Sequence, residues 1–339
     1  MIGSMIRPCT PPDVPAAAQP PAQLPAWALP DGPAGDGTDD AFRAGAALHA
    51  LDLLVRSEPA WAGAWRQRAA LRCAAASMRL AGRREDENAL RDAWHLRRPG
   101  DAPGPAGRIL GAWRLLALRQ LQHSLSRGLL FDHAELATVA EGFGFNPGDG
   151  LAGLAAAVDA LAASSRPAPF VAAAVASHVG AARPDAEMLA WWCADLVLAA
   201  KLRWPRPLPL LMTRALTPAF RSEGGARLRP GRETAEAGEA RHRFEQALCL
   251  ALAEGAAEAL RSAAAIARRA DRLLAVAPKL RAKGAAEVLR KLLDEDAVPG
   301  TLTTKTLSRF GARRLFARLE GFEAVRELSG RTAFRLYGL

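Results

Sequence analysis

The last forty residues of the chain alternate apolar and basic positions in a pattern that predicts a helix followed by a β-hairpin. Within a helix over about 309–320, the apolar positions recur at i, i+3, i+4 and i+7 and so share one face. These positions are Ala312, Leu315, Phe316 and Leu319. Ser308 stands where its hydroxyl oxygen can cap the first turn of that helix. Two strand-like runs follow, 324–328 and 332–337, joined by a Ser-Gly turn.

A shorter helix can be drawn around 301–306, and a further helix over 284–297 can begin the same module. Helix, helix and hairpin is the order of a winged helix-turn-helix, whose second helix lies in the DNA major groove. Arginines occur largely outside the apolar face of that helix and again on the hairpin. We therefore expect them to contact phosphates or base edges. The predicted DNA-binding residues are Arg309, Arg313, Arg314, Arg318, Arg331 and Arg335.

Upstream of this module the apolar pattern is helical throughout. Helices are predicted at about 39–55, 59–82, 85–97, 106–125, 132–142, 150–164, 170–180, 187–202 and 236–276. Alanine is abundant, which favours closely packed helices, while isoleucine and tyrosine are scarce, which disfavours a large sheet. The sequence thus predicts an all-α fold, an Ala-rich multi-helix bundle that ends in a winged helix-turn-helix with a small β-hairpin. Most of the tryptophans fall on apolar helical faces and are expected to fill the core.

Composition divides the chain into three parts. Residues 1–38 are rich in proline and alanine and are predicted to form a disordered tail. Residues 39–283 form the predicted helical domain, with an internal loop near 222–233, and residues 284–339 form the winged-helix domain.

The net charge of +10 is concentrated towards the end of the chain. From Arg261 onwards there are 17 basic and 8 acidic residues, against 28 and 27 in the rest. A cation-rich segment attracts polyphosphate by releasing counterions, which favours DNA as a partner. The alternative is a basic surface without a nucleic-acid partner. The excess of arginine over lysine is also typical of a GC-rich coding sequence.

Familiar catalytic and metal-binding motifs are missing from the sequence. There is no phosphate-binding P-loop, no HExxH and no GxSxG, and the cysteines and histidines lack the spacing of a zinc site. We predict no cofactor and no metal, and an enzyme is the less favoured reading. The most apolar run, 188–202, is interrupted by Asp195 and is too short to cross a bilayer. A secretory signal is also lacking, so a cytoplasmic protein is expected.

The region 82–101 gathers acidic and basic side chains at helical spacing. Its structural interpretation is a solvated helix face with ion pairs worth a few tenths of a kcal/mol each, on the order of 0.3. The alternative is an unfamiliar active site. Its candidate residues are Arg84, Glu85, Asp86, Arg91 and His95.

Several stretches resemble a bacterial family, found mostly in alphaproteobacteria, known as domain-of-unknown-function family 1403. The stretches are 65–108, 273–285, 292–298 and 309–339. The closing RELSGRTAFRLYGL is the most specific of them. The resemblance implies a bacterial host but no activity. The hairpin also resembles the winged helices that close Fic-type proteins, although the Fic catalytic loop is missing and AMP transfer is not implied.

Three functions remain open from the sequence. The first is a DNA-associated helical protein, either a transcriptional regulator or the partner of a mobile element. The second is a protein-interaction scaffold that holds a partner or a second copy without binding DNA. The third is an enzyme whose site lies in the polar region 83–98.

Overall fold

The computed structural model describes residues 37–97, 100–122, 130–131, 133–146, 151–222, 224–232, 237–280, 282 and 284–339. The predicted disordered tail therefore lies outside the described residues, except for positions 37 and 38, which begin the first helix. The described chain is mostly helical, with one small three-stranded antiparallel sheet near the C-terminus. This confirms the predicted fold class of a helical protein with a small β element at its end.

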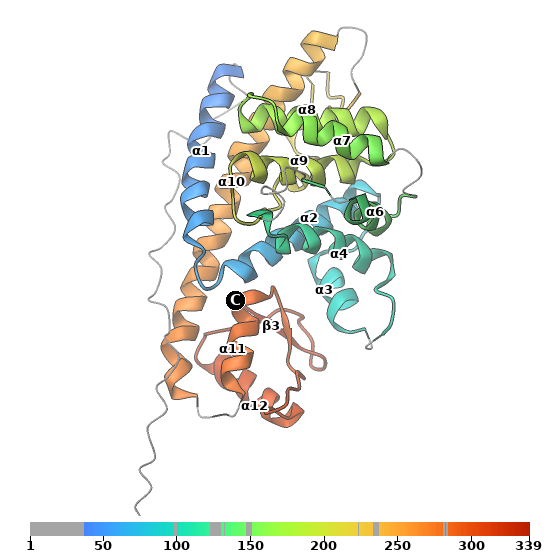
Figure 1. Cartoon of the computed structure of the whole chain (residues 1–339). Helices are drawn as coiled ribbons and strands as arrows, with labels where there is room; N and C mark the ends of the chain where they lie inside the picture. Colours follow the sequence, from blue (N-terminus) through green and yellow to red (C-terminus); the bar gives the residue numbers. More distant parts are fainter. Residues whose placement is uncertain are drawn as a thin grey trace, which may run out of the picture.

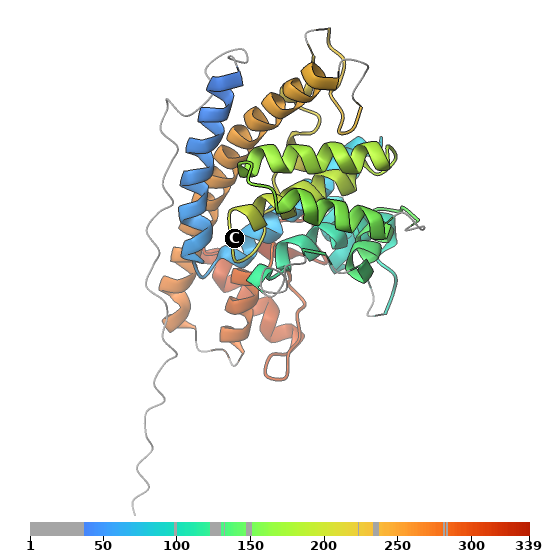
Figure 2. The same ribbon diagram turned by 45° about the horizontal axis from the view of Figure 1, so that its top comes forward.

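Two long helices form one side of the molecule. α1 (Gly37–Ser57) packs lengthwise against α10 (Ala237–Val276), and the two ribbons lie side by side in both views (Figures 1 and 2). α10 agrees with the helix predicted over 236–276. It runs the length of the molecule, so that one end lies beside α8 and the other beside the C-terminal elements (Figure 1).

Shorter helices fill the other side of the molecule. They are α2 (Ala62–Leu80), α3 (Glu87–His95), α4 (Gly104–Leu118), α6 (His133–Gly142), α7 (Leu151–Ala162), α8 (Ala168–Ala182) and α9 (Glu187–Lys201). The described residues also form 3-10 turns later in the chain: η2 (Leu211–Arg214), η3 (Pro218–Phe220) and η4 (Ala277–Lys279). α4 is shorter than the predicted 106–125, because the backbone becomes extended at Arg119. Residues 123–125 of that prediction lie outside the described chain.

Tryptophans anchor the core of the bundle, as the sequence predicts. Six of them are at most 2% exposed: Trp61, Trp65, Trp113, Trp191, Trp192 and Trp204. A buried indole N–H needs an acceptor. Trp65 donates to the carbonyl of Ala259 at 3.0 Å, and Trp113 donates to the hydroxyl of Ser77 at 2.9 Å. These contacts join α2 to α10 and α4 to α2.

The C-terminal module is built from five elements: α11 (Ala285–Asp294), β1 (Val298–Pro299), α12 (Arg309–Gly321), β2 (Arg326–Glu327) and β3 (Leu336–Gly338). The antiparallel sheet has the order β1-β3-β2, with Tyr337 opposite both Val298 and Glu327. The predicted helix over 309–320 is confirmed as α12. Its predicted apolar face is buried, and the Ser308 hydroxyl accepts the N–H of Gly311 at 3.2 Å.

The short helix predicted around 301–306 is wrong. The segment forms irregular turns, in which the Thr304 N–H bonds the Leu307 carbonyl and the Thr304 hydroxyl accepts the Thr306 N–H at 3.3 Å. Threonine hydroxyls that form hydrogen bonds with nearby backbone groups compete with helix formation. The segment 301–306 contains several threonines that can do so. The module thus has a loop in place of the first helix of the predicted helix-turn-helix.

The hairpin strands are also shorter than predicted. The carboxylate of Glu327 accepts the backbone N–H groups of Ser329 and Gly330, both at 2.7 Å, and so pulls the chain into a turn directly after β2. Phe334 has a positive φ of 54°, which interrupts an extended backbone before β3. Among the described residues, no helix has the length and hydropathy needed to span a membrane.

Candidate nucleic-acid interface

The outward face of α12 carries the arginines that the sequence predicts as DNA ligands. Arg309, Arg313, Arg314 and Arg318 are all exposed. In the described part of the chain, none of the ion pairs or side-chain hydrogen bonds involves Arg309, Arg313 or Arg314. Arg318 lies over the ring of Phe322 at 5.6 Å. These guanidinium groups are therefore free of internal carboxylates.

An exposed aromatic residue lies among these arginines. The side chain of Phe310 is 72% exposed, and Arg313 and Arg314 are its i+3 and i+4 neighbours on α12. Ala317 and Gly321, further along the same face, are small and exposed. The helix therefore offers an apolar group and cations on a face that another molecule can approach closely. The sequence reasoning missed Phe310, although an apolar residue outside the buried stripe was a signal for it.

The two predicted arginines of the hairpin, Arg331 and Arg335, form polar contacts with other residues of the protein. Arg331 forms an ion pair with Asp92 of α3. Arg335 donates from Nε to the carbonyl oxygen of Arg331 at 3.0 Å. A hydrogen bond to Tyr337 raises the pKa of the Arg335 guanidinium. The structure thus groups the four arginines of α12 and ties one arginine of the hairpin back to the bundle.

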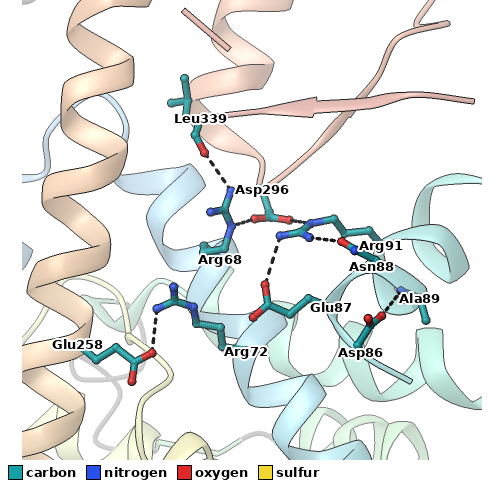
Figure 3. Close-up of polar contacts among 10 residues, drawn as sticks. All are labelled: Arg68, Arg72, Asp86, Glu87, Asn88, Ala89, Arg91, Glu258, Asp296 and Leu339. Carbon is teal, nitrogen blue, oxygen red and sulfur yellow. Dashed lines mark hydrogen bonds and ion pairs between the residues drawn. The ribbon is translucent and has the colours of Figure 1, made fainter. Parts of the chain in front are cut away.

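A buried carboxylate fixes the module to the bundle. Asp296, between α11 and β1, is 4% exposed and lies between Arg68 of α2 and Arg91 of α3 (Figure 3). Arg91 donates from Nε to Asp296 at 2.6 Å, and Arg68 also donates to the carbonyl oxygen of Leu339 at 3.1 Å. Burial opposes the charge of Asp296, but the two arginines outweigh it and hold the pKa of the carboxyl well below its usual range.

Apolar packing orients α12 within the module. The ring of Phe316 stacks on Tyr337 of β3, with centroids 4.7 Å apart and planes 10° from parallel. Val288 and Leu292 of α11 are fully buried and belong to the same continuous core as the helices of the bundle. Because α12, the sheet and the bundle share this core, the exposed face of α12 has a fixed orientation relative to the whole molecule.

The polar region at the turn between α2 and α3 is mostly engaged in structural contacts. Glu85 pairs with Arg83, and the Asp86 carboxylate caps α3 by accepting the Ala89 N–H at 2.9 Å. Arg91 is bonded to Asp296, as described above. These interactions support the structural interpretation of the region, since the carboxylates of Glu85 and Asp86 already have partners.

The candidate catalytic residues of that region are only partly brought together. An open groove of about 440 Å³ is lined by Arg84, Glu85, Asp86 and Arg91, among others, but His95 is not on its lining. Burial, and then the nearby Arg114, lower the pKa of His95 to about 4. Within the described residues, no group of three or more His, Cys, Asp or Glu side chains is arranged to hold a metal ion.

The fold and this surface define a class: a mostly helical protein whose C-terminal α/β module presents a basic helix. The chain belongs to the family described as "Protein of unknown function (DUF1403)", whose profile matches residues 14–339. The resemblance seen in the sequence is thereby confirmed. No curated protein and no solved structure matches the chain.

Proposed function

We propose that this protein binds duplex DNA through the exposed face of α12. The observation that carries the proposal is the row of arginines on that face, three of which have no partner within the described chain. α12 follows β1 and precedes the β2–β3 hairpin, which is the place of the recognition helix in winged-helix proteins. Such a protein serves as a transcriptional regulator or as a partner of a mobile element.

Elementary electrostatics supports the same assignment. An unpaired surface arginine gains little from its own protein but releases a counterion when it meets a DNA phosphate. A bidentate contact to guanine adds about 1–3 kcal/mol of discrimination, and an exposed apolar group can contact the thymine methyl. Phe310, placed beside Arg313 and Arg314, supplies that apolar group.

The test is a fluorescence anisotropy titration of the full chain on random duplex DNA over a series of salt concentrations. The variant Arg313→Ala/Arg314→Ala should weaken binding at least about tenfold at low salt and should lower the log–log salt slope by about 2. Both side chains are exposed, so the variant should unfold at the wild-type temperature.

A matched control removes the same charge elsewhere. The variant Arg229→Ala/Arg261→Ala takes away two exposed arginines that lie outside α12. It should bind DNA almost as tightly as the wild type. Equal weakening by the two double variants would show that only the overall charge matters and would refute a specific role for α12.

A scaffold function has one specific observation in its favour. α1 exposes Phe42 and Leu53, which are 64% and 56% exposed and share one face of the helix. A groove of about 530 Å³ borders the same helix at Gly45 and His49. A second copy of the chain that covers this face would make a dimer, which light scattering detects. Leu53→Glu should then yield a monomer, whereas a wild-type monomer would count against this function.

A further inference from the structure

Arginines from three separate elements lie within electrostatic reach of one another where the C-terminal module meets the bundle. Arg68 and Arg72 lie one helical turn apart on α2, Arg269 comes from α10, and Arg326 comes from β2. Arg72 has a partner in Glu258, at 3.3 Å (Figure 3), but Glu258 is shared with Arg214. The positive charges of Arg269 and Arg326 also need a negative group to balance them.

The register of the sheet places Arg326 beside the buried network. Arg326 is paired with Gly338 on β3, and the next residue, Leu339, accepts the hydrogen bond from Arg68. Gly338 packs so closely on the backbone of Asp296 that a Cβ added at position 338 would lie 2.4 Å from the Asp296 carbonyl oxygen. Arg326 therefore extends from a position next to both Arg68 and Asp296.

The carboxylate at this boundary between module and bundle, Asp296, is already paired. Asp296 is shared between Arg68 and Arg91. Arg269 makes one side-chain hydrogen bond within the described chain, to the carbonyl of Ala265 on its own helix at 3.2 Å. Arg326 makes none within the same residues. Arg269 and Arg326 thus both feel the charge of Arg68, and within the described residues neither forms an ion pair with a carboxylate.

Burial and the neighbouring positive charges lower the pKa of both groups. The pKa of Arg326 is lowered by burial and then by the positive charges of Arg68, Arg269 and Arg91. The pKa of Arg269 is lowered by burial and then by Arg68 and its neighbours on α10. Like charges held together destabilise a fold unless an anion lies between them.

We infer that Arg269 and Arg326, backed by Arg68, form a binding site for a phosphoryl group. The planar fork of arginine matches phosphate oxygens bidentately, and a dianion would neutralise the two cations that lack carboxylates. The guanidinium of Arg326 is partly buried, but the residue as a whole is exposed, so the site can be reached from solvent. The phosphoryl group belongs either to a small phosphorylated molecule or to a DNA backbone. This site does not require DNA binding by α12.

The experiment compares thermal unfolding of the full chain in sodium phosphate and in sodium chloride of equal ionic strength. Phosphate should raise the wild-type midpoint by about 2–4 °C. Arg326→Ala should abolish this shift and should melt in chloride no lower than the wild type, because it removes a like-charge repulsion. Arg269→Gln should also abolish the shift, and Arg261→Ala, an exposed position on the same α10, should retain it. A wild type without a phosphate shift, or equal shifts in wild type and Arg326→Ala, would overturn the site.

A second measurement separates the two sources of the phosphoryl group. If Arg326→Ala weakens binding to duplex DNA, the DNA backbone occupies the site. If DNA affinity is unchanged while the phosphate shift is lost, the occupant is a small phosphorylated molecule. The variant Arg313→Ala/Arg314→Ala should keep the full phosphate shift, so failure of the α12 proposal and failure of the phosphate site give different results.

Discussion

Arg91 of α3 places its Nε atom 2.6 Å from Oδ2 of Asp296, a carboxylate that lies 205 residues further along the chain. The other oxygen of the same carboxylate bonds Arg68 of α2. One buried carboxylate therefore joins α2 and α3 of the bundle to the segment between α11 and β1 of the C-terminal module (Figure 3). Together with the shared apolar core, this contact holds the module that carries α12 against the bundle.

Replacing Asp296 by alanine should destabilise the protein by about 3–5 kcal/mol, because two buried guanidinium groups lose their counter-charge. Urea unfolding measures the change. Hydrogen exchange should show the largest loss of protection in residues 284–339. Asp294→Ala, at an exposed acid two residues earlier, is the control and should change the free energy of unfolding far less. Comparable effects of the two substitutions would contradict a special role for Asp296.

The same carboxylate should make the fold sensitive to acid. The pKa of Asp296 is lower in the folded chain than in the unfolded chain, where it is about 4. Its stabilisation is thus complete above that pH and is lost progressively as the pH falls below it. The wild type should lose stability more steeply between about pH 4 and pH 2 than Asp296→Asn does. Parallel pH profiles of the two proteins would disprove the linkage.

Asp195 of α9 should have the opposite pH dependence. Burial raises the pKa of its carboxyl to about 8, although the N–H groups of Leu210 and Leu211 partly oppose the shift. The unfolded chain releases this proton at about pH 4. Unfolding therefore becomes easier as the pH rises from about 4 to 8. Asp195→Asn should remove this slope and gain stability relative to the wild type as the pH rises. A constant difference between the two would refute the assignment.

The ion pair between Arg331 and Asp92 should restrain DNA binding by the hairpin. Asp92→Asn frees the guanidinium of Arg331 and removes a carboxylate that repels phosphate. We expect DNA affinity to increase a few-fold, and stability to change by only about 0–1 kcal/mol because the pair is partly exposed. Anisotropy titration provides the measurement. The double variant Asp92→Asn/Arg331→Ala should lose the gain, and an equal gain in the double variant would exclude Arg331 as its cause.

Local patterns predicted the elements whose residues interact over a few positions. The spacing of Leu315, Phe316 and Leu319 gave the buried face of α12, and Ser308 gave its start. The threonine-rich loop over 301–306 was missed because side-chain hydrogen bonds to the backbone override helical periodicity. The partners of Asp296 could not be predicted, since Arg68 lies 228 residues away and nothing in the spacing links the two. Whether the α12 arginines bind DNA stays a prediction.

The seam between α8 and α9 has a consequence for how the protein can change. The two helices pack against each other, and many of their almost completely buried residues are alanines: Ala172, Ala173, Ala176, Ala190 and Ala194. Because these positions are buried in a close-packed core, a larger side chain at any of them must displace its neighbours. These alanines, although they are the most repetitive part of the sequence, are therefore among the positions that least tolerate a larger side chain. A saturation mutagenesis survey should find them less tolerant of exchange than the arginine-rich surface that gives the chain its charge.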